Sequence, residues 1–123
     1  MNRLSVYKAH VQFASGRGGK MRPIVILVDN PNEFSLDKSV LAIYSYKNKF
    51  NDKQTRDYYK KILYQIQDPK VAGLNPNMIS YVSVSDVRIF PFQDLLEEAE
   101  FLGELSAKDS RGVIDKYNEY HSS

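Results

Sequence analysis

A glycine-rich, cationic segment that runs directly into a short apolar strand constrains this 123-residue chain more than any other feature. Residues 14–23 read Ala-Ser-Gly-Arg-Gly-Gly-Lys-Met-Arg-Pro, and residues 24–28 read Ile-Val-Ile-Leu-Val. The apolar run is too short for a core helix and rich in β-branched residues, so it indicates a buried strand. Pro23 disfavours the α region for the residue before it, and we expect Arg22 in extended backbone where the strand begins. A cationic loop attached to a rigid core element suits the binding of an anion.

The glycine-rich segment does not match the common nucleotide-binding loops. A Walker A loop needs Ser or Thr after its lysine, but Met21 follows Lys20, and Ala14 occupies the position of the first glycine. The dinucleotide-binding pattern that would start at Gly16 also fails at Met21. The alternative interpretation is a hairpin loop whose cations are only solvated.

The distribution of charge is more informative than its total. The chain has 17 basic and 15 acidic side chains, a formal net charge of +2. Residues 47–61 hold six cations against two acids, whereas residues 94–104 hold five acids and no cation. This asymmetry predicts one electropositive face suited to a polyanion, the alternative being a solvated loop and a solvated acidic helix.

Composition excludes several classes of function. The chain has no cysteine, which excludes disulfides and cysteine-based metal or redox chemistry. The first residues lack the apolar core of a signal peptide, and no apolar run approaches the ~20 residues that span a bilayer. We expect one soluble, cytoplasmic domain over residues 1–123 that does not enter a membrane.

Alternating and apolar runs predict a mainly β chain with short helices. In the first strand one face holds Tyr7, Ala9, Val11 and Phe13, and the other holds Lys8, His10 and Gln12. The expected strands are residues 5–13, 24–28, 40–46, 60–67, 78–84 and 87–90. Turn residues predict loops at 29–38 and 72–77 and an exposed polar excursion at 48–59.

Two regions carry the helical expectations. The acidic residues 92–101 read as a helix after Pro91, and a last helix starts at a Ser106 cap and buries Val113, Ile114 and Tyr117. Residues 60–67 also fit a helix, but we favour a strand because polar residues 61 and 65 alternate with apolar ones. Five or six short strands with terminal helices predict a small, curled β-barrel.

The order of three motifs resembles PemK/MazF-like toxins. The chain matches their opening at Lys20-Met21-Arg22-Pro23, their Ala-Gly-Leu connector at residues 72–77, and their Ile-Gly-x-Leu-Ser/Thr step at residues 102–106. The resemblance covers about residues 5–118. It implies an SH3-like, CcdB/PemK-like β-barrel with a C-terminal helix that forms a homodimer. It also implies a toxin that cuts single-stranded RNA without a metal or other cofactor and is neutralised by an acidic antitoxin protein.

The resemblance assigns two catalytic residues. The arginine of the family's Arg-Pro step falls on Arg22, and its hydroxyl residue at the end of the third strand falls on Ser45. The planar fork of Arg22 suits two phosphate oxygens of a charged transition state. This chain departs from the family by inserting the basic excursion at residues 47–61 and by lacking an acidic residue in the first loop, which leaves the general acid and base open.

Further residues are expected to bind RNA. Cations would hold flanking phosphates, a tyrosine would stack on a base, and a histidine titrates near neutrality. The expected RNA-binding residues are Arg17, Lys20, Lys47, His10 and Tyr46. Tyr44 offers a similar stacking surface, but we favour a place in the barrel core for it.

Two other functions remain open at this point. One is a non-catalytic barrel of the same fold that grips a protein target such as DNA gyrase. The other is a small module that binds RNA without cutting it. The absence of a clear general base keeps both alternatives in view.

Overall fold

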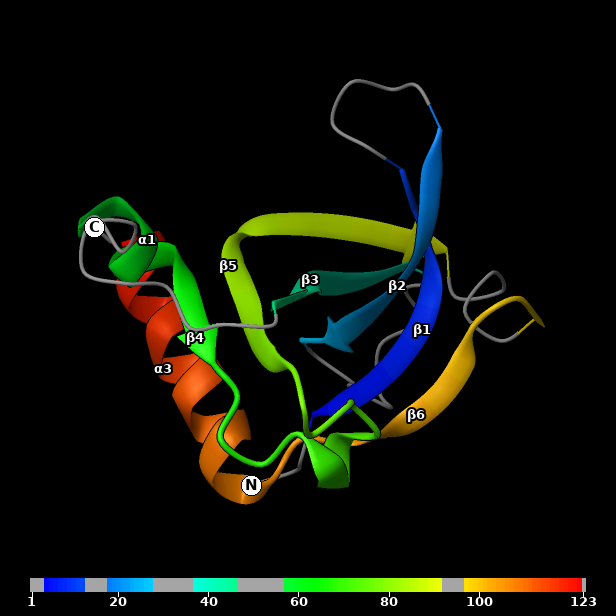
Figure 1. The fold of residues 1–123 in the computed structure, drawn as a ribbon. Helices are drawn as coiled ribbons and strands as arrows, with labels where there is room; N and C mark the ends of the chain where they lie inside the picture. The colour runs from blue at the N-terminus through cyan, green and yellow to red at the C-terminus, as the bar shows by residue number, and fades with distance from the viewer. Residues whose placement is uncertain (1–3, 13–17, 28–36, 47–56, 92–96, 123) are drawn as a thin grey trace.

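The computed structural model describes residues 4–12, 18–27, 37–46, 57–91 and 97–122 (Figure 1). Its strands form one antiparallel, six-stranded sheet in the order β4-β5-β3-β2-β1-β6. The strands are β1 (Ser5–Gln12), β2 (Gly19–Ile26), β3 (Asp37–Tyr46), β4 (Leu63–Gln65), β5 (Ile79–Pro91) and β6 (Glu100–Glu104). The helices are α1 (Asp57–Ile62), the 3-10 helix η1 (Lys70–Ala72) and α3 (Ala107–Ser122). This architecture confirms the expected mainly β fold with a C-terminal helix.

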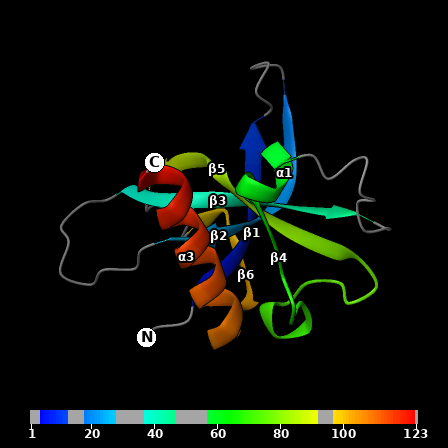
Figure 2. The ribbon, with the colours of Figure 1, turned by 90° about the vertical axis from the view of Figure 1, so that its left-hand side faces the viewer.

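The sheet buries apolar side chains on both of its faces. The larger cluster, which we call the helix-side core, includes Val6, Val25 and Leu41 and packs against α3. Figure 2 shows α3 lying along this side of the sheet. The smaller cluster, on the opposite face, contains Ala9, Val11, Ile24, Ile26 and Val40. Neighbouring residues of each strand alternate between the two faces, as a pleated strand requires.

The strand pattern of β1 is confirmed, whereas β2 and β3 begin earlier than expected. Strand β2 starts at Gly19 and not at Ile24, because its first residues already pair with β1, with Arg22 opposite Ala9 and Pro23 opposite Lys8. The ladder between β2 and β3 starts only at Ile24. Pro23 is therefore tolerated inside the strand, since a residue without an N–H fits where one side is unpaired. The predicted loop 29–38 falls mostly outside the described residues, and β3 begins at Asp37.

Residues 60–67 combine both of the structures that their sequence allowed. Helix α1 ends at Ile62, and only Leu63–Gln65 form a strand. The favoured strand was therefore wrong for residues 60–62, which are helical, and for residues 66–67, which follow the end of β4. Most of the expected excursion at 48–59 lies outside the described residues.

The two short strands expected at 78–84 and 87–90 are one strand. Strand β5 runs through Ser85 and Asp86 and bends sharply along its length (Figure 1). Its pairing with β3 shifts here, because Leu41 lies opposite Val87 but Ile43 lies opposite Val82. A distance of two residues along β3 therefore corresponds to five residues along β5. The extra residues of β5, which include Ser85 and Asp86, form a bulge and not a turn.

The acidic helix expected at 92–101 is wrong at its C-terminal end. Residues 92–96 lie outside the described residues, and β6 begins at Glu100. Pairing explains the difference: Glu100 lies opposite Lys8, and Phe101 lies opposite Tyr7 with their ring centroids 5.3 Å apart. Cross-strand pairs of this kind override the local helical pattern.

The last helix and the connector at residues 72–77 agree with the sequence-based expectation. Ser106 Oγ accepts a hydrogen bond from the Asp109 backbone at 3.0 Å, which is the expected N-cap. Val113 is fully buried, and Ile114 and Tyr117 pack on the helix-side core. Gly73 ends η1 with φ +75°, where a Cβ would lie 2.2 Å from the carbonyl oxygen of Leu102. The connector therefore needs glycine at this position.

A buried carboxylate attaches α3 to the segment after β4. Asp109 is fully buried and accepts hydrogen bonds from the Tyr64 hydroxyl at 2.7 Å and from the backbones of Gln67 and Asp68. Burial and this hydrogen bond raise the pKa of Tyr64 well above that of an ordinary tyrosine. A buried charge with this many donors is satisfied, so the contact fixes α3 against β4.

Candidate functional site

The site is built around Arg22, which β2 holds on the face opposite the helix-side core. Because Ile24 lies opposite Ala42, the same antiparallel register carried two residues further brings Arg22 level with Tyr44. The guanidinium carbon of Arg22 lies 4.4 Å from the centre of the Tyr44 ring. This cation–π contact fixes the direction of the arginine while leaving its N–H donors for another ligand.

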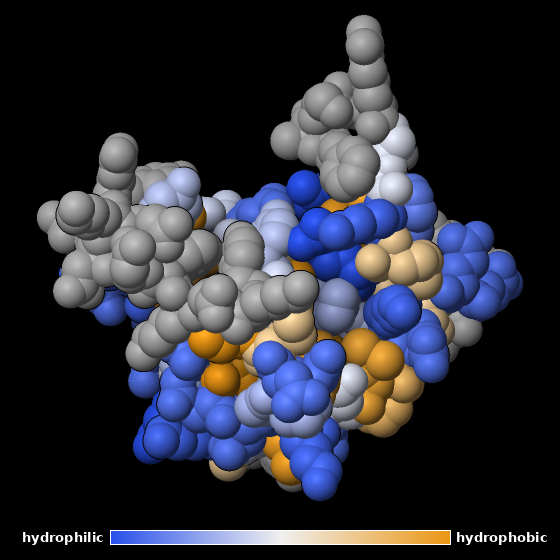
Figure 3. All heavy atoms as spheres, viewed as in Figure 1, coloured by the Kyte–Doolittle hydropathy of each residue, from blue (hydrophilic) through white to orange (hydrophobic). Residues whose placement is uncertain are grey.

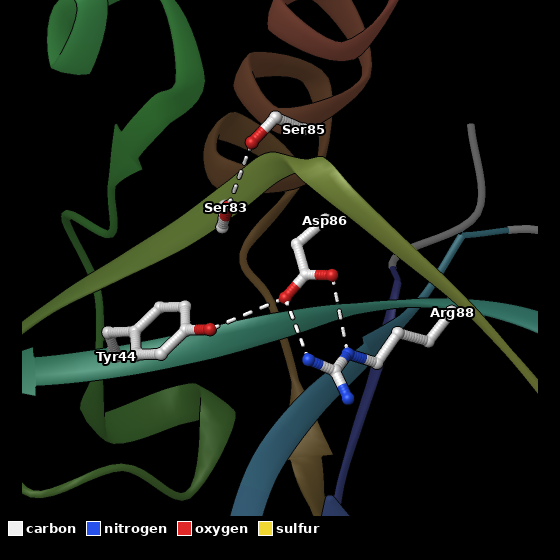
Figure 4. A network of polar contacts seen from close by, with 5 residues as sticks. All are labelled: Tyr44, Ser83, Ser85, Asp86 and Arg88. Carbon is white, nitrogen blue, oxygen red and sulfur yellow. Dashed lines mark hydrogen bonds and ion pairs between the residues drawn. The ribbon is translucent and has the colours of Figure 1, made fainter. Parts of the chain in front are cut away.

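Tyr44 also contacts an ion pair on β5, formed by Asp86 and Arg88 (Figure 4). Its hydroxyl donates a hydrogen bond to Asp86 Oδ2 over 3.4 Å. Arg88 donates to both oxygens of the same carboxylate, from Nε to Oδ1 and from Nη2 to Oδ2, each over 3.3 Å. Asp86 and Arg88 are two residues apart and so project from the same face of β5. The side chains of Arg22, Tyr44, Asp86 and Arg88 therefore form one polar cluster, which we call the arginine–tyrosine cluster.

The charges of this cluster suit an anion. Two guanidinium groups outnumber one carboxylate, which leaves a net positive charge beside the phenol. Burial raises the pKa of Tyr44, the Asp86 carboxylate raises it further, and Arg22 and Arg88 oppose both effects. Because the pKa of Tyr44 is raised overall, the phenol keeps its proton at neutral pH and acts there as a hydrogen-bond donor.

Ser45 and Tyr44 point to opposite faces of β3. Ser45 is exposed, and its Oγ lies 2.9 Å from Oγ of Ser80 on β5. Tyr44, and not Ser45, is the hydroxyl residue that the structure brings to Arg22. The catalytic role expected for Ser45 remains a prediction, but the residue does not join the arginine–tyrosine cluster.

The expected RNA-binding residues are distributed over both faces of the hairpin. Lys20 is exposed, lies opposite Val11, and shares the face of Arg22 by strand alternation. His10 is exposed too, but it lies opposite Met21 on the other face. Arg17 and Lys47 lie outside the described residues, as does the side chain of Tyr46.

Asp86 and Arg88 are the site residues that the sequence did not indicate. Their spacing of two residues is the one available signal, because it places them on one face of a strand. That signal is hidden when Ser85 and Asp86 are interpreted as a break between two strands. Tyr44 was considered, though as a stacking surface or a core residue and not for its hydroxyl.

The described surface is mixed in character. Figure 3, viewed as in Figure 1, shows hydrophilic side chains over much of the visible surface, with hydrophobic ones in separate patches between them. Met21 and Phe101 are exposed apolar side chains on the hairpin and on β6. Among the described residues, no three acidic or histidine side chains cluster so as to hold a metal ion. No described helix combines the length and apolarity needed to cross a bilayer.

Comparison with known proteins identifies the fold. No family model and no curated protein matches the sequence. Among solved structures, the chain is similar to the Mycobacterium tuberculosis toxin MazF-mt6, with a TM-score of 0.60 over 96% of each chain and 17% sequence identity. The chain thus has a MazF-like fold, as the order of its motifs predicted.

Proposed function

We propose that this protein is the toxin of a toxin–antitoxin pair and an endoribonuclease that cuts single-stranded RNA without a metal ion. The observation that carries the proposal is Arg22, a half-buried side chain that Tyr44 orients within a cluster of net positive charge. The MazF-like fold supports the same conclusion. A guanidinium in this position is suited to a phosphodiester, since its planar fork can donate two hydrogen bonds to phosphate oxygens.

The reaction would proceed by attack of the 2′-hydroxyl on the adjacent phosphorus. The transition state carries more negative charge on its phosphate oxygens than the substrate does, and Arg22 would stabilise that added charge. The products are a 2′,3′-cyclic phosphate and a free 5′-hydroxyl. Lys20, on the same face, would contact a flanking phosphate.

The proposal includes two protein partners. A second copy of the chain would complete the RNA groove, and an acidic antitoxin would cover the cationic face in the cytoplasm. A disordered acidic segment is attracted to such a face and becomes ordered when it binds. RNA and antitoxin would then compete for the same residues.

Cleavage of RNA in the presence of EDTA tests the proposed function. Wild-type protein should cut a mixed-sequence single-stranded RNA, and Arg22→Ala should lose about 2–4 kcal/mol of transition-state stabilisation, the usual cost of removing such a donor. Arg111→Ala is the matched control, because Arg111 is an exposed arginine on α3. If folded wild-type protein binds RNA but never cuts it, the chain is a binding module and this proposal is wrong.

A further inference from the structure

The arginine–tyrosine cluster contains a hydroxyl–carboxylate pair that phosphate binding by Arg22 does not use. The Tyr44 hydroxyl is placed at the end of a ring that Arg22 covers, and it reaches Asp86 over 3.4 Å. An ordinary O–H···O hydrogen bond is about 2.7–2.8 Å long, so this one is weak. A charged phosphate oxygen or a leaving oxygen would be a better acceptor for the same proton.

The carboxylate of Asp86 keeps the capacity to accept a further proton. Oδ2 accepts from both Tyr44 and Arg88, whereas Oδ1 accepts only from Arg88 Nε among the contacts of the described residues. Each carboxylate oxygen has two lone pairs, which leaves one acceptor position on Oδ1. The side chain of Asp86 is 34% exposed, so a ligand can approach it.

We propose that Tyr44 and Asp86 are the general acid and the general base of the RNA cleavage. The inference rests on the proposed function. Asp86 Oδ1 takes the proton of the 2′-hydroxyl while the 2′-oxygen forms its bond to phosphorus. The bond from phosphorus to the 5′-oxygen breaks, and the departing oxygen takes the Tyr44 proton. Attacking and leaving oxygens lie on opposite sides of the phosphorus, so two separate groups are required.

Proton exchange with water returns the site to its starting state. After one turnover Asp86 is protonated on Oδ1 and Tyr44 is a phenolate. Oδ1 gives its proton to water and the phenolate takes one from water, so no proton is gained or lost overall. The groups that face Tyr44 are Arg22 from β2 together with Asp86, Arg88 and the opposing Tyr81 from β5. Burial and Asp86 keep the phenol protonated before each turnover.

A change of leaving group separates proton donation from a structural role. Wild-type protein is first used to map a cleavage position in a mixed-sequence RNA. A short RNA is then made with sulfur in place of the 5′-bridging oxygen at that position, because a thiolate leaves without needing a proton. Tyr44→Phe keeps the ring that contacts Arg22 and removes only the hydroxyl. Tyr7→Phe, which removes a hydroxyl from β1, is the matched control.

The two substrates should respond differently to the variants. Tyr44→Phe should cut the oxygen substrate ~10²- to 10³-fold more slowly than wild type, the usual contribution of a general acid, and the sulfur substrate at nearly the wild-type rate. Asp86→Asn should be slow on both substrates, and Tyr7→Phe on neither. Circular dichroism establishes that each variant is folded.

Other results would overturn the inference. If Tyr44→Phe is equally slow on both substrates, or is unimpaired on the oxygen substrate, Tyr44 does not protonate the leaving group. If Asp86→Asn retains the wild-type rate, Asp86 is not the base. A wild-type protein that cuts neither substrate nor the mapping RNA overturns the proposed function itself, which is a separate and recognisable result.

Discussion

The backbone and the side chain of Arg22 are fixed by different neighbours. Pairing with Ala9 holds the backbone, and the Tyr44 ring orients the guanidinium. The family resemblance assigned Arg22 a catalytic role, which stays a prediction. The sequence could not predict the partner, since the choice between Tyr44 and Ser45 depends on the register of β2 against β3, which no local pattern contains.

Replacing Arg22 by lysine tests whether shape or charge matters. Arg22→Lys keeps the positive charge but loses the planar fork and its stacking on Tyr44. We expect RNA affinity to change little and the cleavage rate to fall by ~10-fold or more, as for the loss of a bidentate contact in the transition state. Binding by fluorescence anisotropy and single-turnover rates measure the two effects. A lysine variant with the wild-type rate would mean that charge alone is sufficient.

Ser45 gives the complementary prediction. If the hydroxyl that assists Arg22 belongs to Tyr44, Ser45→Ala should cut RNA within about twofold of wild type. Ser45 points to the opposite face of β3 from Tyr44, and its partner is Ser80 on the neighbouring strand β5. The cleavage rate of this variant is measured beside that of Tyr44→Phe. Loss of cleavage in Ser45→Ala with an intact fold would restore the role that the family resemblance implies for Ser45.

At the scale of elements, long-range pairing decides where local patterns fail. The alternation in β1 and the cap at Ser106 were predicted correctly, because both signals lie within a few residues. The bulged β5 and the strand at Glu100 were not, because their conformations depend on β3 and β1. The polar residues of the bulge look like a turn in sequence, although in the structure they present Asp86 to Tyr44.

The contact between Tyr64 and Asp109 predicts a pH-dependent stability. Tyr64→Phe should lower the free energy of unfolding at neutral pH by about 1.5–3 kcal/mol, as expected for a hydrogen bond to a charged group. The folded-state pKa of Tyr64 is raised, so its contribution is complete below the unfolded pKa of ~10 and is lost as pH rises toward the folded value. The difference between wild type and variant should therefore shrink above about pH 10.

Urea unfolding across this pH range provides the measurement. Tyr117→Phe, which removes a tyrosine hydroxyl from α3, is the control. A difference between wild type and Tyr64→Phe that stays constant into the alkaline range would contradict the coupling of Tyr64 to Asp109.

Two glycines of the described segments have positive φ and give a matched pair of variants. At Gly18 (φ +73°) nothing lies within 4 Å of the position that a Cβ would occupy, whereas at Gly73 (φ +75°) that position lies 2.2 Å from a backbone oxygen. Gly18→Ala should cost about 1–2 kcal/mol from conformation alone. Gly73→Ala should cost clearly more, because backbone of β6 must also shift. Equal losses in thermal unfolding would show that the contact with Leu102 is not restrictive.

For the whole molecule, the central feature is a sheet with two differently used faces. The helix-side core and α3 occupy one face, and the other combines a smaller apolar cluster with the arginine–tyrosine cluster. Composition and motif order were enough to predict this class of fold. They could not predict which face carries the site, because that depends on how all six strands are paired.

Charge reversal tests whether RNA and an acidic partner use the same face. Lys20→Glu should weaken binding of single-stranded RNA and of a synthetic acidic peptide together, and should flatten the salt dependence of RNA binding by about one released counterion. Glu97→Lys, at an exposed position, is the control and should weaken neither. If Lys20→Glu weakens only one of the two ligands, the shared site is wrong.

In the proposed function, Arg22 and its neighbours promote attack by a 2′-hydroxyl on phosphorus. The most direct measurement uses an RNA with a single 2′-deoxy nucleotide on the 5′ side of the mapped cleavage position. In EDTA, wild-type protein should leave this position uncut while it converts the all-ribose RNA to a 2′,3′-cyclic phosphate and a 5′-hydroxyl. Cleavage of the 2′-deoxy RNA at an undiminished rate, or products with a 3′-hydroxyl and a 5′-phosphate, would contradict attack by the 2′-hydroxyl.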